Sequence, residues 1–292
     1  MIFGKVDDPG TVNFVLPPDH PDTKQVFTRS ESTPGLNVYV GCAKWNRSDL
    51  KGFYPRGTKD ELTYYANQFN SIELNATFYN IPAIQQVVAW RDKTPDDFRF
   101  FPKITGTISH YKRLNGVGSL VEEFCSNISN FEEKLGMVFL QLHNNFTFKN
   151  FDLLKEFVLS FPAGIPLAVE LRNNAWFTDN NISSQLYSFL ERNNVANVLV
   201  DTAGRRDLLH MRLTTPTAFI RYVGANHSSD YKRLDDWVER LGNWITAGLE
   251  NLYFFVHQNI EKESPLLAAY FIQKLNEKCG LSVRWPRQNN LF

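Results

Sequence analysis

Short apolar runs that end in polar residues recur about eight times along this chain. Each run has the length and side-chain content of a buried strand, and each is followed by a stretch with the end signals of a helix. We predict strands at residues 38–42, the beginning of 71–82, 98–103, 137–143, 167–172, 195–201, 218–222 and 252–257. Helices are predicted near residues 58–69, 82–90, 119–136, 152–159, 183–192, 205–210, 234–247 and 264–280.

This alternation predicts an α/β fold with a single (β/α)8 TIM barrel, because regularly alternating strands and helices in this number close into a parallel barrel. No GxGxxG motif follows the first predicted strand, which weighs against an open dinucleotide-binding sheet. The barrel is expected to span residues 37–280. Residues 1–36, with several prolines and aspartates, are predicted to form an irregular arm that covers the barrel or docks a partner, and residues 281–292 a tail.

The composition is typical of a folded protein with a large core and no excess charge. Hydrophobic residues make up 43% of the chain, and 31 basic residues balance 31 acidic ones. Balanced charge weighs against a protein that coats nucleic acid non-specifically. The three cysteines form no CxxC pair and no signal-peptide pattern is seen, so we expect reduced thiols and a cytoplasmic location. Because the apolar runs are short, no membrane partner is expected.

Polar side chains follow the apolar part of most predicted strands, and the carboxyl ends of barrel strands meet at one face. These strand-end residues are Lys44, Glu73, Asn75, Lys103, Gln141, His143, Glu170, Arg172, Asp201, Arg221, His257 and Asn259. Side-chain parity supports the same arrangement, since Ala168, Glu170 and Arg172 share one face of their strand. Each inward face is then apolar low in the barrel and polar at its top.

Several of these residues also have a purely structural interpretation. Glu170 and Arg172 could form an ion pair that closes the top of the barrel. Glu73 and Asn75 could bond loop amides. His143 and His257, taken singly, are more often core histidines than ligands. The sequence leaves these alternatives open.

Longer motifs resemble a known family. The segments GCAKWNRSDLKGFYP, ELTYYANQFNSIELNATFYNIP, TPDDFRFFPK, KLGMVFLQL, VELRNNAWF and FIRYVG occur in the order seen in the YecE-like family, also called domain of unknown function 72. The resemblance covers about residues 37–275. It implies a (β/α)8 barrel with a polar pocket at the strand ends and no settled activity. The similarity of that fold to xylose isomerase and endonuclease IV implies sugar or nucleic-acid substrates by analogy alone.

The resemblance also carries a site onto positions of this chain. The matching residues are Trp45, Tyr54, Glu73, Asn75, Phe78, Tyr79, Lys103, His110, Gln141, Glu170, Arg172, Trp176 and Arg221. The chain departs from the family pattern in three places: Val256-His257-Gln258-Asn259 stands where the family has a Phe-Asn-Asn-like run, Ser109-His110 where it has Thr-His, and His143 where it has proline. We therefore expect pocket chemistry to differ in this branch.

The leading hypothesis is an enzyme, either a hydrolase, a lyase or an isomerase, that binds an anionic small molecule at the C-terminal face of the barrel. The anion would be phosphorylated or carboxylated. Catalysis is assigned to Glu73, Glu170, Lys103 and His143. Substrate binding is assigned to Lys44, Trp45, Asn75, Tyr79, His110, Gln141, Arg172, Trp176, Asp201, Arg221, His257 and Asn259.

Two other functions stay open at this point. A nucleic-acid-binding or endonuclease IV-like protein would place the same cations on phosphates and stack bases on Trp45, Tyr79 and Trp176. A non-catalytic binding module would dock a partner through the arm. No cofactor and no metal is assigned, because several cations at one mouth would repel a divalent ion. Carboxylates and histidines at separate strand ends leave a divalent metal as an alternative.

Overall fold

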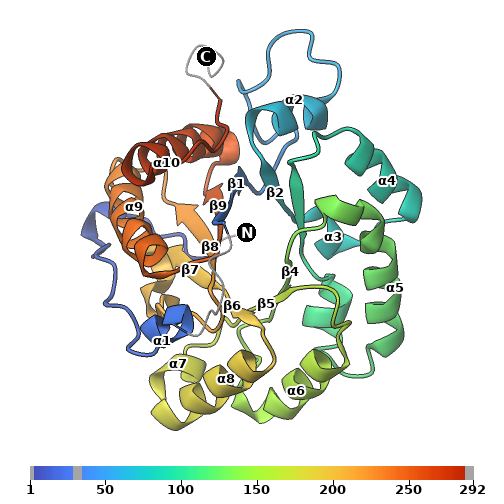
Figure 1. Cartoon of the computed structure of the whole chain (residues 1–292), viewed down its shortest axis with the longest axis vertical. Helices are drawn as coiled ribbons and strands as arrows, with labels where there is room; N and C mark the ends of the chain where they lie inside the picture. The colour runs from blue at the N-terminus through green and yellow to red at the C-terminus, as the bar shows by residue number, and fades with distance from the viewer. Residues whose placement is uncertain (1–2, 29–34, 287–292) are drawn as a thin grey trace.

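Parallel strands form the centre of the molecule and helices form a ring around them (Figure 1). The computed structural model describes residues 3–28 and 35–286; residues 1–2 and 29–34 of the predicted arm and 287–292 of the predicted tail lie outside the described residues. The described strands are β1 (Asn37–Cys42), β2 (Ser71–Leu74), β3 (Arg99–Pro102), β4 (Val138–Gln141), β5 (Leu167–Glu170), β6 (Ala196–Asn197), β7 (Leu199–Thr202), β8 (Thr217–Gly224) and β9 (Asn251–Gln258).

The strands close into a barrel in which the paired neighbours are parallel. One sheet has the order β3-β2-β1-β9-β8-β7 and the other β4-β5-β6. Parallel bridges between Phe100 and Leu135 and between Lys103 and Phe139 join β3 to β4. Strands β6 and β7 are two pieces of one strand interrupted at Val198, and they pair with β5 and β8 respectively. The predicted (β/α)8 barrel is therefore confirmed, with its sixth strand broken in two.

An apolar layer fills the lumen beneath the carboxyl ends of the strands. Its members are Phe101, Met137, Phe139, Ala168, Ala196, Val198, Val200, Phe219 and Phe255. Polar residues follow two positions later on the same inward faces, as Arg221 follows Phe219 and Lys103 follows Phe101. The large buried rings thus set the level at which the polar side chains of the barrel top lie.

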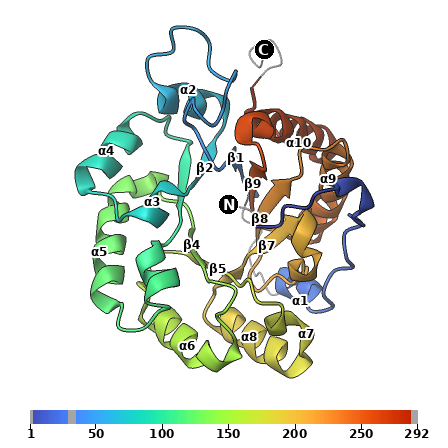
Figure 2. The same ribbon diagram turned by 180° about the vertical axis from the view of Figure 1, so that it is seen from behind.

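Helices cover the outside of the barrel on all sides (Figures 1 and 2). They are α1 (Thr23–Thr28), α2 (Glu61–Gln68), α3 (Ala76–Tyr79), α4 (Ile84–Asp92), α5 (Gly118–Ile128), α6 (Phe151–Ser160), α7 (Ala175–Thr178), α8 (Asn180–Arg192), α9 (Ser229–Ala247) and α10 (Ser264–Cys279). The short helices α3 and α7 follow strand ends and precede the longer helices that pack on the barrel. Among the described residues, no helix combines the length and the apolar character needed to cross a membrane.

The described part of the arm lies against the barrel. Asp19 accepts hydrogen bonds from the side chains of Arg240 and Trp244 on α9. The Thr23 hydroxyl donates to the Met211 carbonyl at 3.0 Å. These contacts fix the arm along α9, so it covers part of the barrel, which is one of the two roles expected for it.

The beginning of the predicted tail is also attached to the barrel. The Asn276 side chain of α10 exchanges two hydrogen bonds with the Val283 backbone, at 2.9 and 3.0 Å. Arg284 donates to the Phe69 carbonyl at 3.2 Å and pairs with Asp97 at 3.0 Å. Residues 281–286 therefore pack against the barrel.

The hydroxyl group of one tyrosine bridges the backbones of the first two strands. Tyr65 of α2 is fully buried. Its hydroxyl accepts the Cys42 backbone N–H at 2.7 Å and donates to the Ser71 carbonyl at 3.0 Å. One side chain thus satisfies a donor on β1 and an acceptor on β2 that would otherwise be buried without partners.

Replacing this hydroxyl should destabilise the barrel. We expect Tyr65→Phe to lower the free energy of unfolding by about 1–3 kcal/mol, because two buried backbone groups lose their partner. Urea denaturation followed by circular dichroism measures the change. The matched control is Tyr64→Phe on the same helix, since the buried Tyr64 hydroxyl has no hydrogen-bond partner among the described residues. That change should be neutral or slightly stabilising, and equal losses in both variants would contradict the bridging role.

Candidate active site

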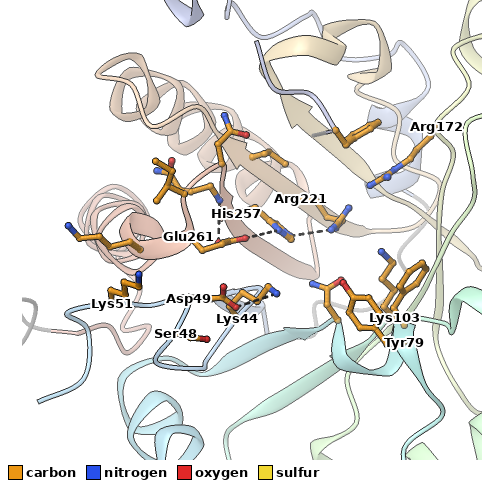
Figure 3. A pocket seen from close by; sticks show the side chains of 18 residues that line it. Lys44, Ser48, Asp49, Lys51, Tyr79, Lys103, Arg172, Arg221, His257 and Glu261 are labelled. Carbon is orange, nitrogen blue, oxygen red and sulfur yellow. Dashed lines mark hydrogen bonds and ion pairs between the residues drawn. The ribbon is translucent and has the colours of Figure 1, made fainter. Parts of the chain in front are cut away.

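A cavity of about 650 Å³ opens at the C-terminal mouth of the barrel (Figure 3). Its walls come from the loops that follow several strands and from the beginning of the arm. Among the residues assigned from the sequence, those that line it are Lys44, Asn75, Tyr79, Lys103, Arg172, Arg221, His257 and Asn259. The barrel therefore brings half of the predicted site together on the wall of one cavity.

Arg221 ties together strands on opposite sides of this mouth. It projects from β8, and its Nε and Nη2 donate to the two carboxylate oxygens of Glu73 on β2 at 2.8 and 2.7 Å. Its Nη1 donates to Oε2 of Glu170 on β5 at 2.7 Å. All three side chains are buried. Bidentate pairs of this kind are strong and directional, so a single guanidinium fixes both carboxylates.

Glu170 is held from its other side as well. Arg172 donates from Nε to Oε1 of Glu170 at 2.7 Å, and Gln141 donates from Nε2 to the same oxygen at 2.9 Å. The ion pair considered from the sequence between Glu170 and Arg172 is therefore present. It is one part of a larger buried network.

The two buried carboxylates are ionised at neutral pH. Burial raises the pKa of Glu73, but Arg221 and His257 outweigh it and hold that pKa well below its ordinary value. Burial also raises the pKa of Glu170, yet Arg221 and Arg172 bring it down to about 2. Neither carboxyl group carries a proton near pH 7, so neither can act there as a general acid.

Lys103 lies on the floor of the cavity and is only 3% exposed. Its Nζ donates to Oε1 of Gln141 at 2.8 Å and lies 4.1 Å from the centre of the Phe78 ring. Burial lowers the pKa of Lys103, the charges of Arg221 and Arg172 lower it further, and it reaches about 7. Lys103 is therefore a buried group that changes its protonation near neutral pH.

His257 extends the network toward the rim. Its Nε2 lies 3.0 Å from Oε2 of Glu73, and its Nδ1 lies 3.7 Å from Oε1 of Glu261. Burial lowers the pKa of His257, but the carboxylate of Glu73 outweighs it and the pKa is raised. Asn75 donates to Oε1 of Glu73 at 2.8 Å. Two of the predicted binding residues thus orient a carboxylate as well as line the cavity.

Of the four cationic residues predicted at the strand ends, Lys103, Arg172 and Arg221 reach the buried layer and Lys44 does not. Lys44 stays at the rim, where its Nζ lies 3.4 Å from Asp49 and its side chain is 36% exposed. Side-chain parity explains the difference: Tyr39 faces the lumen, whereas Lys44 has the opposite parity and lies past the end of β1.

Asp201, predicted to bind substrate, does not line the cavity. Its carboxylate accepts hydrogen bonds from Trp237 at 2.7 Å and from Arg233 at 2.8 Å, both on α9, and also bonds Arg206. Val200 belongs to the lumen layer, so the next residue along the strand points outward. The structure therefore places Asp201 in an ion cluster between the sheet and α9.

Two of the three rings expected to stack on a ligand are packing residues. Trp176 is fully buried and donates from Nε1 to the Phe146 carbonyl at 2.8 Å. Trp45 packs edge-on against Trp90, with ring centres 5.8 Å apart. Neither tryptophan lines the cavity, whereas Tyr79 lies on its rim and is 70% exposed.

His110 and His143 lie beside the mouth. The His110 ring is 4.9 Å from Phe78 and 5.6 Å from His143, centre to centre. Burial and then the charge of Lys103 lower the pKa of His110 to about 4. His143 is exposed and bonds Asn145. Neither histidine is among the cavity-lining residues, so the catalytic role assigned to His143 has no geometric support there.

Sequence reasoning missed residues that reach the cavity from distant parts of the chain. Phe3 of the arm lines the cavity, and the centre of its ring lies 3.8 Å from the guanidinium carbon of Arg172. Glu261 lines it from the loop after β9. The position of Glu261 four residues after His257 is a weak signal for this pairing. No sequence signal connects Phe3 to its partner, because their contact depends on the path of the arm.

The described residues contain no group of three histidine, cysteine, aspartate or glutamate side chains suited to a metal ion. Of the ligands considered from the sequence, Asp201 lies in the α9 cluster and His143 is exposed. Glu73 and Glu170 are occupied by cationic side chains. The arrangement of these residues does not fit a divalent metal.

Fold and cavity together define a (β/α)8 barrel protein with a charged cavity at its C-terminal mouth. The family model described as "Protein of unknown function DUF72" matches residues 39–290. The chain belongs to the DUF72 family, as its motifs indicated.

Individual members of the family show the same relationship. The UPF0759 protein YecE of Escherichia coli (strain K12) is 28% identical over 280 residues, covering 87% of this chain and 100% of that protein. A DUF72 crystal structure from Thermotoga maritima matches with a TM-score of 0.65 at 28% identity, over 82% of this chain and 99% of that one. One from Enterococcus faecalis matches with a TM-score of 0.67 at 21% identity, over 86% and 99%.

Removing the central guanidinium should destabilise the protein strongly. We expect Arg221→Gln to lower the free energy of unfolding at pH 7 by about 3–5 kcal/mol, because two buried carboxylates lose a partner. In the wild type the lowered pKa values of Glu73 and Glu170 give stability that is present above about pH 4.3 and is lost as the pH falls below it. In the variant these pKa values rise, so the stability difference should shrink from pH 7 to pH 4.5.

Urea denaturation at the two pH values measures this effect. Adding Glu73→Gln to Arg221→Gln removes one uncompensated charge and should recover part of the loss at pH 7. A stability difference that stays constant with pH, together with no recovery in the double variant, would show that Arg221 contributes through packing alone.

Proposed function

We propose that this protein is an enzyme that binds a phosphorylated or carboxylated small molecule at the mouth of its barrel. The proposal rests on one observation: the buried polar layer holds three cationic side chains, Lys103, Arg172 and Arg221, against two carboxylates, Glu73 and Glu170. The three cationic side chains all line the cavity, whereas the two glutamates do not. An anion entering the cavity therefore meets the positive side of the network.

Electrostatics at the floor of the cavity support anion binding. Charges near one another interact more strongly where water is scarce. Burial lowers the pKa of Lys103, and the positive charges of Arg221 and Arg172 lower it further. A bound phosphate or carboxylate would supply the missing negative charge, and it could accept charge-assisted hydrogen bonds from side chains that are already fixed in place.

The cavity is large enough for a small molecule that has further atoms beyond its anionic group. About 650 Å³ lies within the range of typical ligand pockets. Tyr79, exposed at the rim, could contact the part of the ligand that extends beyond the cations. This arrangement favours a phosphorylated or carboxylated sugar or a molecule of similar size.

The proposed roles of the side chains follow from their protonation. Glu73 and Glu170 are permanently ionised near neutral pH, so we assign them to orienting Arg221 rather than to proton transfer. Lys103 can give or take a proton near pH 7 and faces the cavity, which suits a general base or acid. A lyase or an isomerase that moves a proton beside a carbonyl group agrees best with a lysine in this role.

Nucleic-acid binding receives less support from the same geometry. Trp45 and Trp176, two of the three rings that would stack on bases, are engaged in packing. Tyr79 is the ring of this set that remains exposed at the cavity. We therefore favour a small molecule over an oligonucleotide.

Anions should stabilise the protein against heat in a saturable way. At a concentration of inorganic phosphate or a sugar phosphate one hundred times the dissociation constant, the gain should be about 2.7 kcal/mol. Differential scanning fluorimetry measures it against sodium chloride of equal ionic strength. Arg172→Gln should remove most of the phosphate-dependent shift, because this change removes a cation that lines the cavity.

The matched control is Lys274→Gln on α10, which removes one positive charge from a lysine that does not line the cavity and is 41% exposed. That variant should keep the full shift. The proposal fails if phosphate, sulfate and sugar phosphates all leave the melting curve of the wild type where chloride leaves it.

A further inference from the structure

The surroundings of the Lys103 amine are unusual for a buried lysine. A buried ammonium group normally needs a carboxylate partner to offset its loss of hydration. Within the described residues Lys103 forms no ion pair, and its Nζ contacts the neutral amide oxygen of Gln141 and the face of Phe78. The amide oxygen accepts a hydrogen bond from the amine, and the Phe78 ring offers a weak cation–π contact. Neither partner carries the negative charge that would hold the amine in its protonated form.

The orientation of Gln141 is fixed by the carboxylate network. Its amide nitrogen donates to Glu170 at 2.9 Å, so its amide oxygen is the atom that faces Lys103 at 2.8 Å. A neutral amine can donate one hydrogen to this oxygen and keep its lone pair for another atom. Gln141 therefore positions the amine without neutralising a positive charge on it.

The neighbouring guanidinium groups act on the same amine. Burial is the larger cause and their positive charges add to it, and together they bring the pKa of Lys103 to about 7, so the amine is partly unprotonated at neutral pH. Lysines that are desolvated beside another cation become nucleophiles toward carbonyl groups. The arginines that suppress protonation are also the ones placed to hold an anionic substituent, so one arrangement would serve both purposes.

We propose that Lys103 is a nucleophile that forms an imine with an aldehyde or ketone group of the anionic substrate. This inference rests on the proposed function and narrows its substrate to a phosphorylated or carboxylated carbonyl compound. Arg172 and Arg221 would hold the anionic group at the cavity wall, and the Lys103 amine on the floor would reach the carbonyl carbon (Figure 3).

The reaction balances without an oxidant or reductant. The nitrogen lone pair forms the N–C bond while the carbonyl π pair moves to oxygen. That oxygen leaves as water with one hydrogen from the amine and one proton from solvent. The product is a protonated imine, which can accept electrons from a bond at the adjacent carbon. Such a step suits the lyase or isomerase chemistry proposed above.

Reductive trapping tests the proposal on the full-length protein. Sodium borohydride delivers hydride to an imine carbon and turns it into a stable secondary amine. The probes are dihydroxyacetone phosphate and pyruvate, which are anionic ketones, with dihydroxyacetone as the uncharged control. Intact mass and peptide mapping locate the adduct. We expect one adduct per chain at Lys103 with at least one anionic probe, at least tenfold less with dihydroxyacetone, and loss of the adduct when phosphate competes.

A lysine at the rim of the cavity, Lys44, allows adduct formation at two lysines to be compared within the same protein. Lys44 lines the same cavity but is partly exposed and forms an ion pair with Asp49, which Lys103 lacks among the described residues. Adduct formation at Lys103 should be half-maximal near pH 7, and at that pH the adduct should form at Lys103 in preference to Lys44. Lys103→Met should abolish the adduct. If that variant does not fold, peptide mapping of the wild type still decides the question.

Two results would overturn the inference. One is labelling of Lys44 to the same extent as Lys103 at pH 7, which indicates non-specific reaction. The other is the absence of any adduct at Lys103 with both ketones while phosphate still stabilises the wild type against heat. That second result would leave the anion site intact and restrict Lys103 to proton transfer. If phosphate also fails to stabilise the protein, the proposed function fails as well.

Discussion

The bonds of one buried guanidinium organise the top of this barrel. Arg221 reaches from β8 to Glu73 on β2 and to Glu170 on β5, and it bonds both carboxylates. Because an unpaired buried charge is costly, each partner constrains the position of the others. Gln141 and Arg172 are held through Glu170, and Lys103 is held through Gln141. The geometry of the cavity floor therefore depends on this ion-paired centre.

The polar network lies directly above a layer of apolar side chains that fills the barrel lumen. Aromatic rings such as Phe101, Phe139 and Phe219 fill the lumen just below the polar side chains. They exclude water from beneath the network, which strengthens its internal electrostatic interactions. The same exclusion lowers the pKa of Lys103, since that lysine has a neutral amide as its nearest hydrogen-bonding partner. Packing at one level thus sets the chemistry at the level above.

Side-chain parity accounts for much of what the sequence could predict about the site. Glu170 and Arg172, like Phe219 and Arg221, alternate inward on their strands, and both pairs lie as their parity requires. The assignment of Asp201 ignored the same rule, because Val200 faces the lumen and its neighbour must face outward. Proximity to a strand end was therefore a weaker guide than parity.

The sequence by itself determined the closed barrel, the family and the layer of polar residues at the strand ends, because these follow from local periodicity and from motifs contiguous in the chain. The tertiary structure alone decided which charged side chains pair with each other. It also decided that Lys103 is buried beside a neutral amide and that Phe3 contacts Arg172. These features depend on distances between side chains far apart in the sequence. The strength of these contacts depends on how deeply the side chains are buried, and no single stretch of sequence specifies that burial.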